Sequence, residues 1–77
     1  MEVIVQVMSI HVRYLGGKYK DRVILEDGDS VKALIRKVNI PEQEVGIITV
    51  NGRQADPDFV LNNGDKIQLF PPALGGG

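Results

Sequence analysis

The 77-residue sequence contains no cysteine, no tryptophan, two tyrosines, two phenylalanines and one histidine. Without cysteine the chain has no disulfide, no thiolate nucleophile and no cysteine metal site, so any sulfur that it carries must be attached to another group. No stretch approaches the roughly 20 apolar residues that a membrane-spanning helix needs. Met1-Glu2 begins a strand pattern rather than a positively charged signal peptide. These absences predict a cytoplasmic protein with no membrane contact.

The sequence also lacks an excess of charge of either sign, with nine basic and ten acidic residues and a net charge of -1. The densest basic stretch comprises Arg13, Lys18, Lys20 and Arg22, with Asp21 among them. It falls short of the continuous positive surface that a phosphate backbone requires. We therefore expect a solvated hairpin surface and no nucleic-acid partner.

Three apparent motifs lack the residues that their chemistry requires. Gly16-Gly17-Lys18 has neither the full glycine spacing of a phosphate loop nor the hydroxyl residue that follows its lysine. The aspartates Asp56, Asp58 and Asp65 do not have calcium-loop spacing. His11 has no serine, cysteine or carboxylate partner at a recognisable spacing. The sequence predicts no metal site and no self-contained enzyme.

A chain of this length makes one domain with a modest core. Its first part predicts two strands, Val3 to Ile10 and Tyr19 to Leu25, joined by a glycine turn. Ser30 is then a candidate N-cap, because apolar residues follow it at helical spacing. These residues are Val31, Leu34, Ile35 and Val38.

The second part predicts a strand from Ile47 to Val50 and a short return strand at Arg53-Gln54. Asn51-Gly52 between them is the pair favoured where a two-residue hairpin needs positive φ at both positions. A last strand alternates from Lys66 to Phe70. The fold class is therefore predicted to be α+β, a mixed sheet with one helix packed across it.

The chain ends with Gly75, Gly76 and Gly77, which follow Phe70-Pro71-Pro72-Ala73-Leu74 directly. Glycine has no β-carbon, so such a tail can thread a narrow channel, whereas the two prolines keep its base stiff and extended. We expect a folded domain at residues 1–72 and a flexible C-terminal tail at residues 73–77. The terminal carboxylate is the predicted reactive group.

Three segments resemble one known group of proteins. They are Val50-Asn51-Gly52-Arg53, then Asn63-Gly64-Asp65-Lys66-Ile67 leading to Leu69-Phe70, and Phe70-Pro71-Pro72 followed by terminal glycines. In this order they resemble the ubiquitin-like sulfur carriers MoaD, the small subunit of molybdopterin synthase, and ThiS, the thiamine sulfur carrier. The resemblance implies the ubiquitin-like β-grasp fold.

The resemblance also implies a function for the terminus. The C-terminal glycine would be adenylated by a MoeB/ThiF-like adenylyltransferase of the ubiquitin-activating type, which uses ATP, and converted to a thiocarboxylate that donates sulfur. The family usually ends in Gly-Gly two residues after Phe-Pro-Pro, and here a third glycine follows. Gly77 is then the acyl residue, or it is trimmed to expose Gly76, or it is not native.

The implied destination is molybdopterin, in molybdenum cofactor biosynthesis, with a MoaE-like large subunit of molybdopterin synthase as partner. The chain would bind no cofactor itself and would act as a carrier or small non-catalytic subunit. Three alternatives stay open. The sulfur goes to thiazole synthase or another pathway, as for ThiS; the protein is a ubiquitin-like modifier that forms isopeptides; or it is an interaction module with an inert tail.

Side-chain parity along the last strand suggests where the partner binds. If Ile67 and Leu69 face the helix, Phe70 faces outward beside the tail. Phe70 is then a candidate partner anchor, with Leu74 as a second contact; alternatively, Phe70 packs beneath the first hairpin. The predicted partner-binding set is Phe70, Pro71, Pro72, Leu74 and Gly75.

Overall fold

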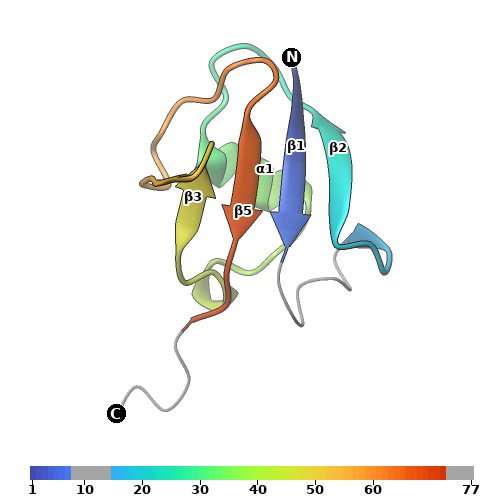
Figure 1. The fold of residues 1–77 in the computed structure, drawn as a ribbon, viewed down its shortest axis with the longest axis vertical. Helices are drawn as coiled ribbons and strands as arrows, with labels where there is room; N and C mark the ends of the chain where they lie inside the picture. Colours follow the sequence, from blue (N-terminus) through green and yellow to red (C-terminus); the bar gives the residue numbers. More distant parts are fainter. Residues whose placement is uncertain (8–14, 73–77) are drawn as a thin grey trace.

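The computed structural model describes residues 1–7 and 15–72. It contains one sheet and one α-helix, which lies behind the sheet in Figure 1. The elements are β1 (Glu2–Val7), β2 (Lys20–Ile24), α1 (Val31–Lys37), the 3-10 helix η2 (Glu42–Glu44), β3 (Ile48–Val50), β4 (Arg53–Gln54) and β5 (Lys66–Leu69).

The five strands form a mixed sheet in the order β2-β1-β5-β3-β4. The two strands at its centre, β1 and β5, run parallel, with Val5 opposite Ile67. The other three pairings, β1 with β2, β3 with β5 and β3 with β4, are antiparallel. This arrangement confirms the predicted α+β class with a mixed sheet and one α-helix.

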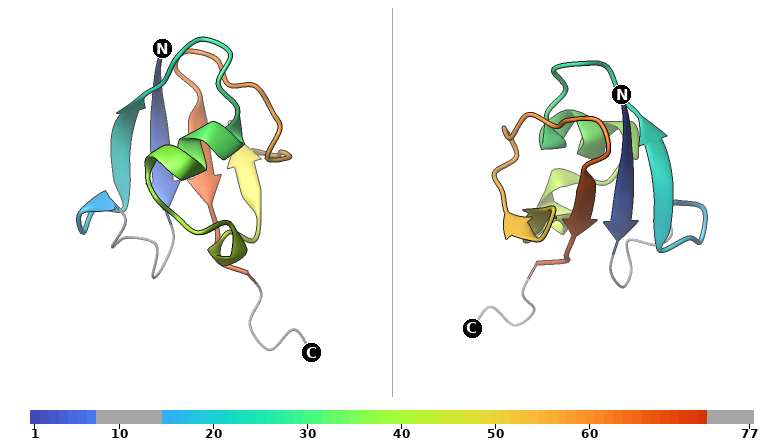
Figure 2. Two further views of the ribbon diagram at one scale, coloured as in Figure 1. Left: turned by 180° about the vertical axis from the view of Figure 1, so that it is seen from behind. Right: turned by 45° about the horizontal axis from the view of Figure 1, so that its top comes forward.

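The hydrophobic core lies between the sheet and α1, which crosses one face of the sheet (Figure 2). Burial alternates along β1 and β5, because successive side chains of a strand point to opposite faces. Val5, Ile67 and Leu69 are completely buried on the covered face, and Leu34 of α1 meets them there. The predicted orientation of Ile67 and Leu69 toward the helix is confirmed.

Helix α1 begins where the sequence indicates. The Ser30 hydroxyl accepts a hydrogen bond from the Ala33 backbone N–H at 3.3 Å, which satisfies one of the free donors of the first turn. Arg36 and Lys37 occupy the last turn, where cations complement the exposed carbonyl groups. Asn39 follows with a φ of 62° and turns the chain toward η2.

Some element boundaries differ from the prediction. The first strand ends at Val7 in the described part of the chain, and the rest of the predicted Val3 to Ile10 strand lies outside it. In the second strand, the Tyr19 carbonyl accepts a hydrogen bond from the Val7 N–H of β1, and Leu25 is bonded to Met1, but both residues fall just beyond β2. Helix η2 was not predicted from the sequence, because it has only one turn and no apolar periodicity.

Candidate functional site

The candidate site is centred on the segment Phe70-Pro71-Pro72, called here the tail root, which follows β5. Strand β5 lies between β1 and β3, so the chain leaves the sheet from its interior rather than from an edge strand. Pro71 and Pro72 have no backbone N–H, so the β-ladder cannot continue through them. The tail root is therefore the last part of the chain that the sheet can hold.

Phe70 is bonded to two consecutive residues of the segment that enters β3. Its backbone N–H donates to the Ile47 carbonyl at 2.9 Å, and its carbonyl accepts from the Gly46 N–H at 2.7 Å. Two residues on one strand thus face one residue on the other, which is the pattern of a β-bulge. A bulge disrupts the pairing of two strands locally, so the pairing of β5 with β3 ends here. Beyond Phe70 the chain turns away from the sheet.

Gly46 lies directly against the backbone of the tail root. A β-carbon added to Gly46 would stand 2.6 Å from the Pro71 carbonyl oxygen and 2.7 Å from the Pro72 α-carbon. Helix η2 ends two residues before Gly46 and lies beside the tail root in the left view of Figure 2. The tail root therefore passes over a position where only glycine fits without displacement.

The sheet face that α1 leaves open is polar next to the tail root. The Thr49 hydroxyl donates to the Gln68 side-chain carbonyl at 2.8 Å, and the Gln68 amide donates to the Gln6 side-chain carbonyl at 3.3 Å. These three half-buried side chains link β3, β5 and β1 across the open face. Phe70 is also half-buried and follows Gln68 on the same parity. It therefore lies beside this uncharged polar row, on the side of the tail root.

Two of the segments that carry the family resemblance are bonded to each other. Asn51, in the β3–β4 turn, donates through its side-chain amide to the Asp65 carboxylate at 2.9 Å. The other Asp65 oxygen accepts from the Asn62 N–H at 2.8 Å, and the Asn51 side-chain carbonyl accepts from the Lys66 N–H at 3.0 Å. Asn51 and Gly52 have φ values of 53° and 86°, which confirms the predicted turn. These residues have a structural role.

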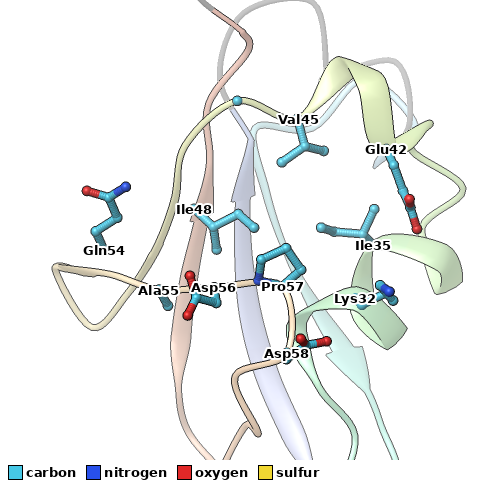
Figure 3. Close-up of a pocket in the computed structure, with 11 residues that line it drawn as sticks. Lys32, Ile35, Glu42, Val45, Ile48, Gln54, Ala55, Asp56, Pro57 and Asp58 are labelled. Carbon is cyan, nitrogen blue, oxygen red and sulfur yellow. The ribbon is translucent and has the colours of Figure 1, made fainter.

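A cavity of about 440 Å³ lies between α1, η2 and the segment that follows β4 (Figure 3). The side chains of Ile35, Val45, Ile48 and Pro57 point toward one another at its floor, whereas Gln54 points away. Charged side chains stand at the rim, namely Lys32, Glu42, Asp56 and Asp58. Gly46 lines one end of the cavity, so the cavity borders the tail root.

The structure describes part of the predicted site, and the rest lies outside the described residues. Phe70, Pro71 and Pro72 come together with Gly46, which the sequence analysis did not single out. Leu74 and the glycines at 75–77 lie outside the described residues, as do His11 and Arg13. The one sequence signal for Gly46 is a glycine between a short polar segment and a buried strand.

Two further findings concern the described ranges, residues 1–7 and 15–72. None of their helices has the length and apolar content that a membrane span requires. Within the same ranges no group of three or more His, Asp or Glu side chains is placed to hold a metal ion.

A mixed five-stranded sheet with one helix across one face, and a chain that leaves from a central strand, define a ubiquitin-like β-grasp protein. The sequence model of the Mut7-C ubiquitin family matches residues 16–74, which is more than half of the chain. The chain belongs to the Mut7-C ubiquitin family. None of the curated proteins searched matches it.

Solved structures with the same fold cover nearly the whole chain. Small archaeal modifier protein 1 of Haloferax volcanii is 15% identical, with a TM-score of 0.77 over 94% of this chain and 98% of that one. A protein described as molybdopterin converting factor subunit 1 of Pyrococcus furiosus is 28% identical, with a TM-score of 0.75 over 95% of this chain and 99% of that one.

A third solved structure is the complex of subunits 1 and 2 of the molybdopterin-converting factor from Helicobacter pylori. The matching chain is 23% identical, with a TM-score of 0.63 over 99% of this chain and 100% of that one. The family match and these structures confirm the predicted resemblance to the ubiquitin-like sulfur carrier group and its β-grasp fold. The similar proteins are small ubiquitin-like proteins or subunits.

Proposed function

We propose that this protein is a sulfur carrier whose C-terminal glycine, Gly77 or Gly76, is adenylated and then converted to a thiocarboxylate. The observation that supports it most is the tail root. Phe70 is held by two hydrogen bonds at the end of a central strand, and two prolines then direct the chain away from the sheet. A rigid domain with a glycine tail suits delivery of an acyl group into another protein's active site.

The proposed chemistry needs no catalytic side chain from this protein. A terminal carboxylate oxygen attacks the α-phosphorus of ATP in the activating partner, and pyrophosphate leaves. Hydrosulfide sulfur then attacks the acyl carbon, and AMP leaves with the electron pair of the broken carbon–oxygen bond. The activated intermediate turns a poor electrophile into a good one, which is the general logic of covalent activation. The chain acts as a carrier or non-catalytic subunit and holds no cofactor.

We propose two successive partners for the tail in the cytoplasm, where ATP is supplied. The first is an adenylyltransferase of the MoeB/ThiF type. The second is a large subunit of molybdopterin synthase, which would pass the sulfur to a pterin precursor. The Helicobacter pylori complex of converting factor subunits 1 and 2 supports this second partner, because its subunit has the same fold over the whole chain.

The second candidate function is a protein modifier, in which the activated glycine forms an isopeptide with a target lysine. The fold shared with small archaeal modifier protein 1 favours it. Both functions begin with the same adenylate, so they differ in the nucleophile that accepts the acyl group. Sulfur delivery to thiazole synthase remains a third destination for the same carrier chemistry.

The test is intact-mass spectrometry of the protein after incubation with its adenylyltransferase, ATP and a sulfur source. A sulfur carrier gains about 16 mass units, because sulfur replaces one acyl oxygen. Lysine-linked adducts instead identify a modifier, and a chain unchanged with every such enzyme contradicts both functions. A chain that lacks residues 76 and 77 is the control, and fragment ions from protein of the native source show which glycine carries the sulfur.

A further inference from the structure

Gly46 is the glycine of the described ranges that lies closest to the backbone of another segment. That segment is the tail root. Among the six glycines there, Gly46 alone would bring an added β-carbon within 4 Å of other atoms. All three nearest atoms, which belong to Pro71 and Pro72, are backbone atoms at 2.6 to 2.9 Å. Real β-carbons do not come this close to other heavy atoms, so one side must move.

The tail root is the side that would move. Side-chain atoms can swing away from a methyl group, but backbone atoms cannot do so without changing the direction of the chain. Gly46 is itself held between η2 and β3, and its N–H bonds the Phe70 carbonyl at 2.7 Å. Pro71 and Pro72 have fixed φ angles and no N–H to form a new bond with the sheet. An added methyl group would therefore redirect the chain beyond Phe70.

We propose that Gly46 is a positioning residue that sets the direction in which the tail leaves the domain, so that the docked protein presents its terminus to the activating enzyme. This inference rests on the proposed function. The β-bulge at Gly46 and Ile47 bends the segment that enters β3. Because Gly46 has no side chain, Pro71 and Pro72 can pass close to this segment. A terminus that must meet a bound nucleotide is sensitive to such direction, since a misplacement of about 1 Å costs up to roughly 100-fold in rate.

The first experiment measures the direction of the tail without any partner. The chain has no cysteine, so Ala73→Cys provides a single site for a nitroxide label. In the unsubstituted background we expect strong paramagnetic broadening of the backbone amides around Gly46, because Pro72 lies against it. With Gly46→Ala the broadening there should weaken while the core amides keep their chemical shifts. An identical broadening pattern would overturn the inference.

The second experiment measures adenylation kinetics with unlabelled Gly46→Ala. We expect kcat to fall by about 10-fold or more with KM changed by less than about twofold, since docking is intact and only the terminus is misplaced. A loss of folded protein would instead lower the active concentration. The matched control is Glu26→Ala, an exposed position just after β2 at the end of the sheet opposite the tail root, which should leave both constants unchanged. Native kinetics in Gly46→Ala would refute the positioning role.

A second variant covers the case in which Gly46→Ala does not fold. It keeps Gly46 and replaces Pro71 and Pro72 by glycine, which releases the tail root without adding bulk. We expect lower kcat and weaker broadening around Gly46, and native values would contradict the inference. If the unsubstituted protein is never charged, the proposed function fails, but the label experiment still decides whether Gly46 directs the tail.

Discussion

Asn51 and Asp65 show how single polar residues hold this small sheet together. The Asp65 carboxylate is nearly buried and joins the turn after β3 to the turn before β5. Asn51 also bonds Lys66 through both its backbone and its side chain. Because β5 carries the tail root, this link fixes the start of the strand whose far end leads into the tail root.

We predict that Asp65→Ala destabilises the protein by about 1–3 kcal/mol, because it leaves the Asn62 N–H and the Asn51 amide without their acceptor. Urea unfolding followed by circular dichroism measures the effect. Asp58→Ala removes an exposed carboxylate and should stay within about 0.5 kcal/mol of the native value. Equal stabilities for the two variants would show that the Asp65 link is energetically unimportant.

At the scale of elements, the two faces of β5 differ in burial and polarity. Ile67 and Leu69 are fully buried against the core, whereas Gln68 joins a polar row on the open face. Phe70 comes next on the open-face parity and is half-buried. The strand therefore stabilises the domain with one face and leaves the other open, immediately before the chain turns away.

Phe70→Ala is predicted to weaken binding of the activating enzyme or the large subunit by about 10-fold or more, as truncation of an aromatic anchor commonly does. Calorimetric titration with the folded variant measures the dissociation constant. Phe59→Ala is the matched control, because Phe59 is 43% exposed and lies on the loop after β4. If both variants bind like the native protein, Phe70 is not an anchor and serves local packing alone.

For the molecule as a whole, the core of the described ranges ends before the tail root. Every buried hydrophobic residue of the described ranges lies between Val3 and Leu69. The two parallel central strands join the first and last parts of the domain, so the core closes only when β5 is in place. The core and the proposed reactive terminus thus belong to different parts of one short chain.

Truncation after Pro72 should lower the melting temperature by no more than about 4 °C, which corresponds to a surface change of roughly 0.5 kcal/mol. The same variant should lose all ability to be charged with sulfur, since it lacks the glycine terminus. Differential scanning calorimetry and the mass assay described above measure the two effects. A large loss of stability would mean that the domain extends beyond residue 72.

The sequence was sufficient to predict features that depend on neighbouring residues. Ser30 as N-cap and the Asn51-Gly52 turn follow from local chemistry, and both are confirmed. The bond between Asn51 and Asp65 and the approach of Pro71 to Gly46 join residues far apart in the chain, so no spacing rule indicates them. The predicted reactive role of the glycine terminus stays a prediction, because residues 73–77 lie outside the described part of the chain.

The parallel pairing of β1 with β5 also separates the two ends of the domain. Because the two strands point the same way, Met1 lies at the opposite end of the sheet from Pro72 (Figure 1). The Met1 nitrogen donates to the Leu25 carbonyl at 2.7 Å, and a peptide N–H there can make the same bond. A fluorophore or an affinity resin joined ahead of Met1 would therefore leave the tail root unobstructed, which suits surface-immobilised assays of tail capture.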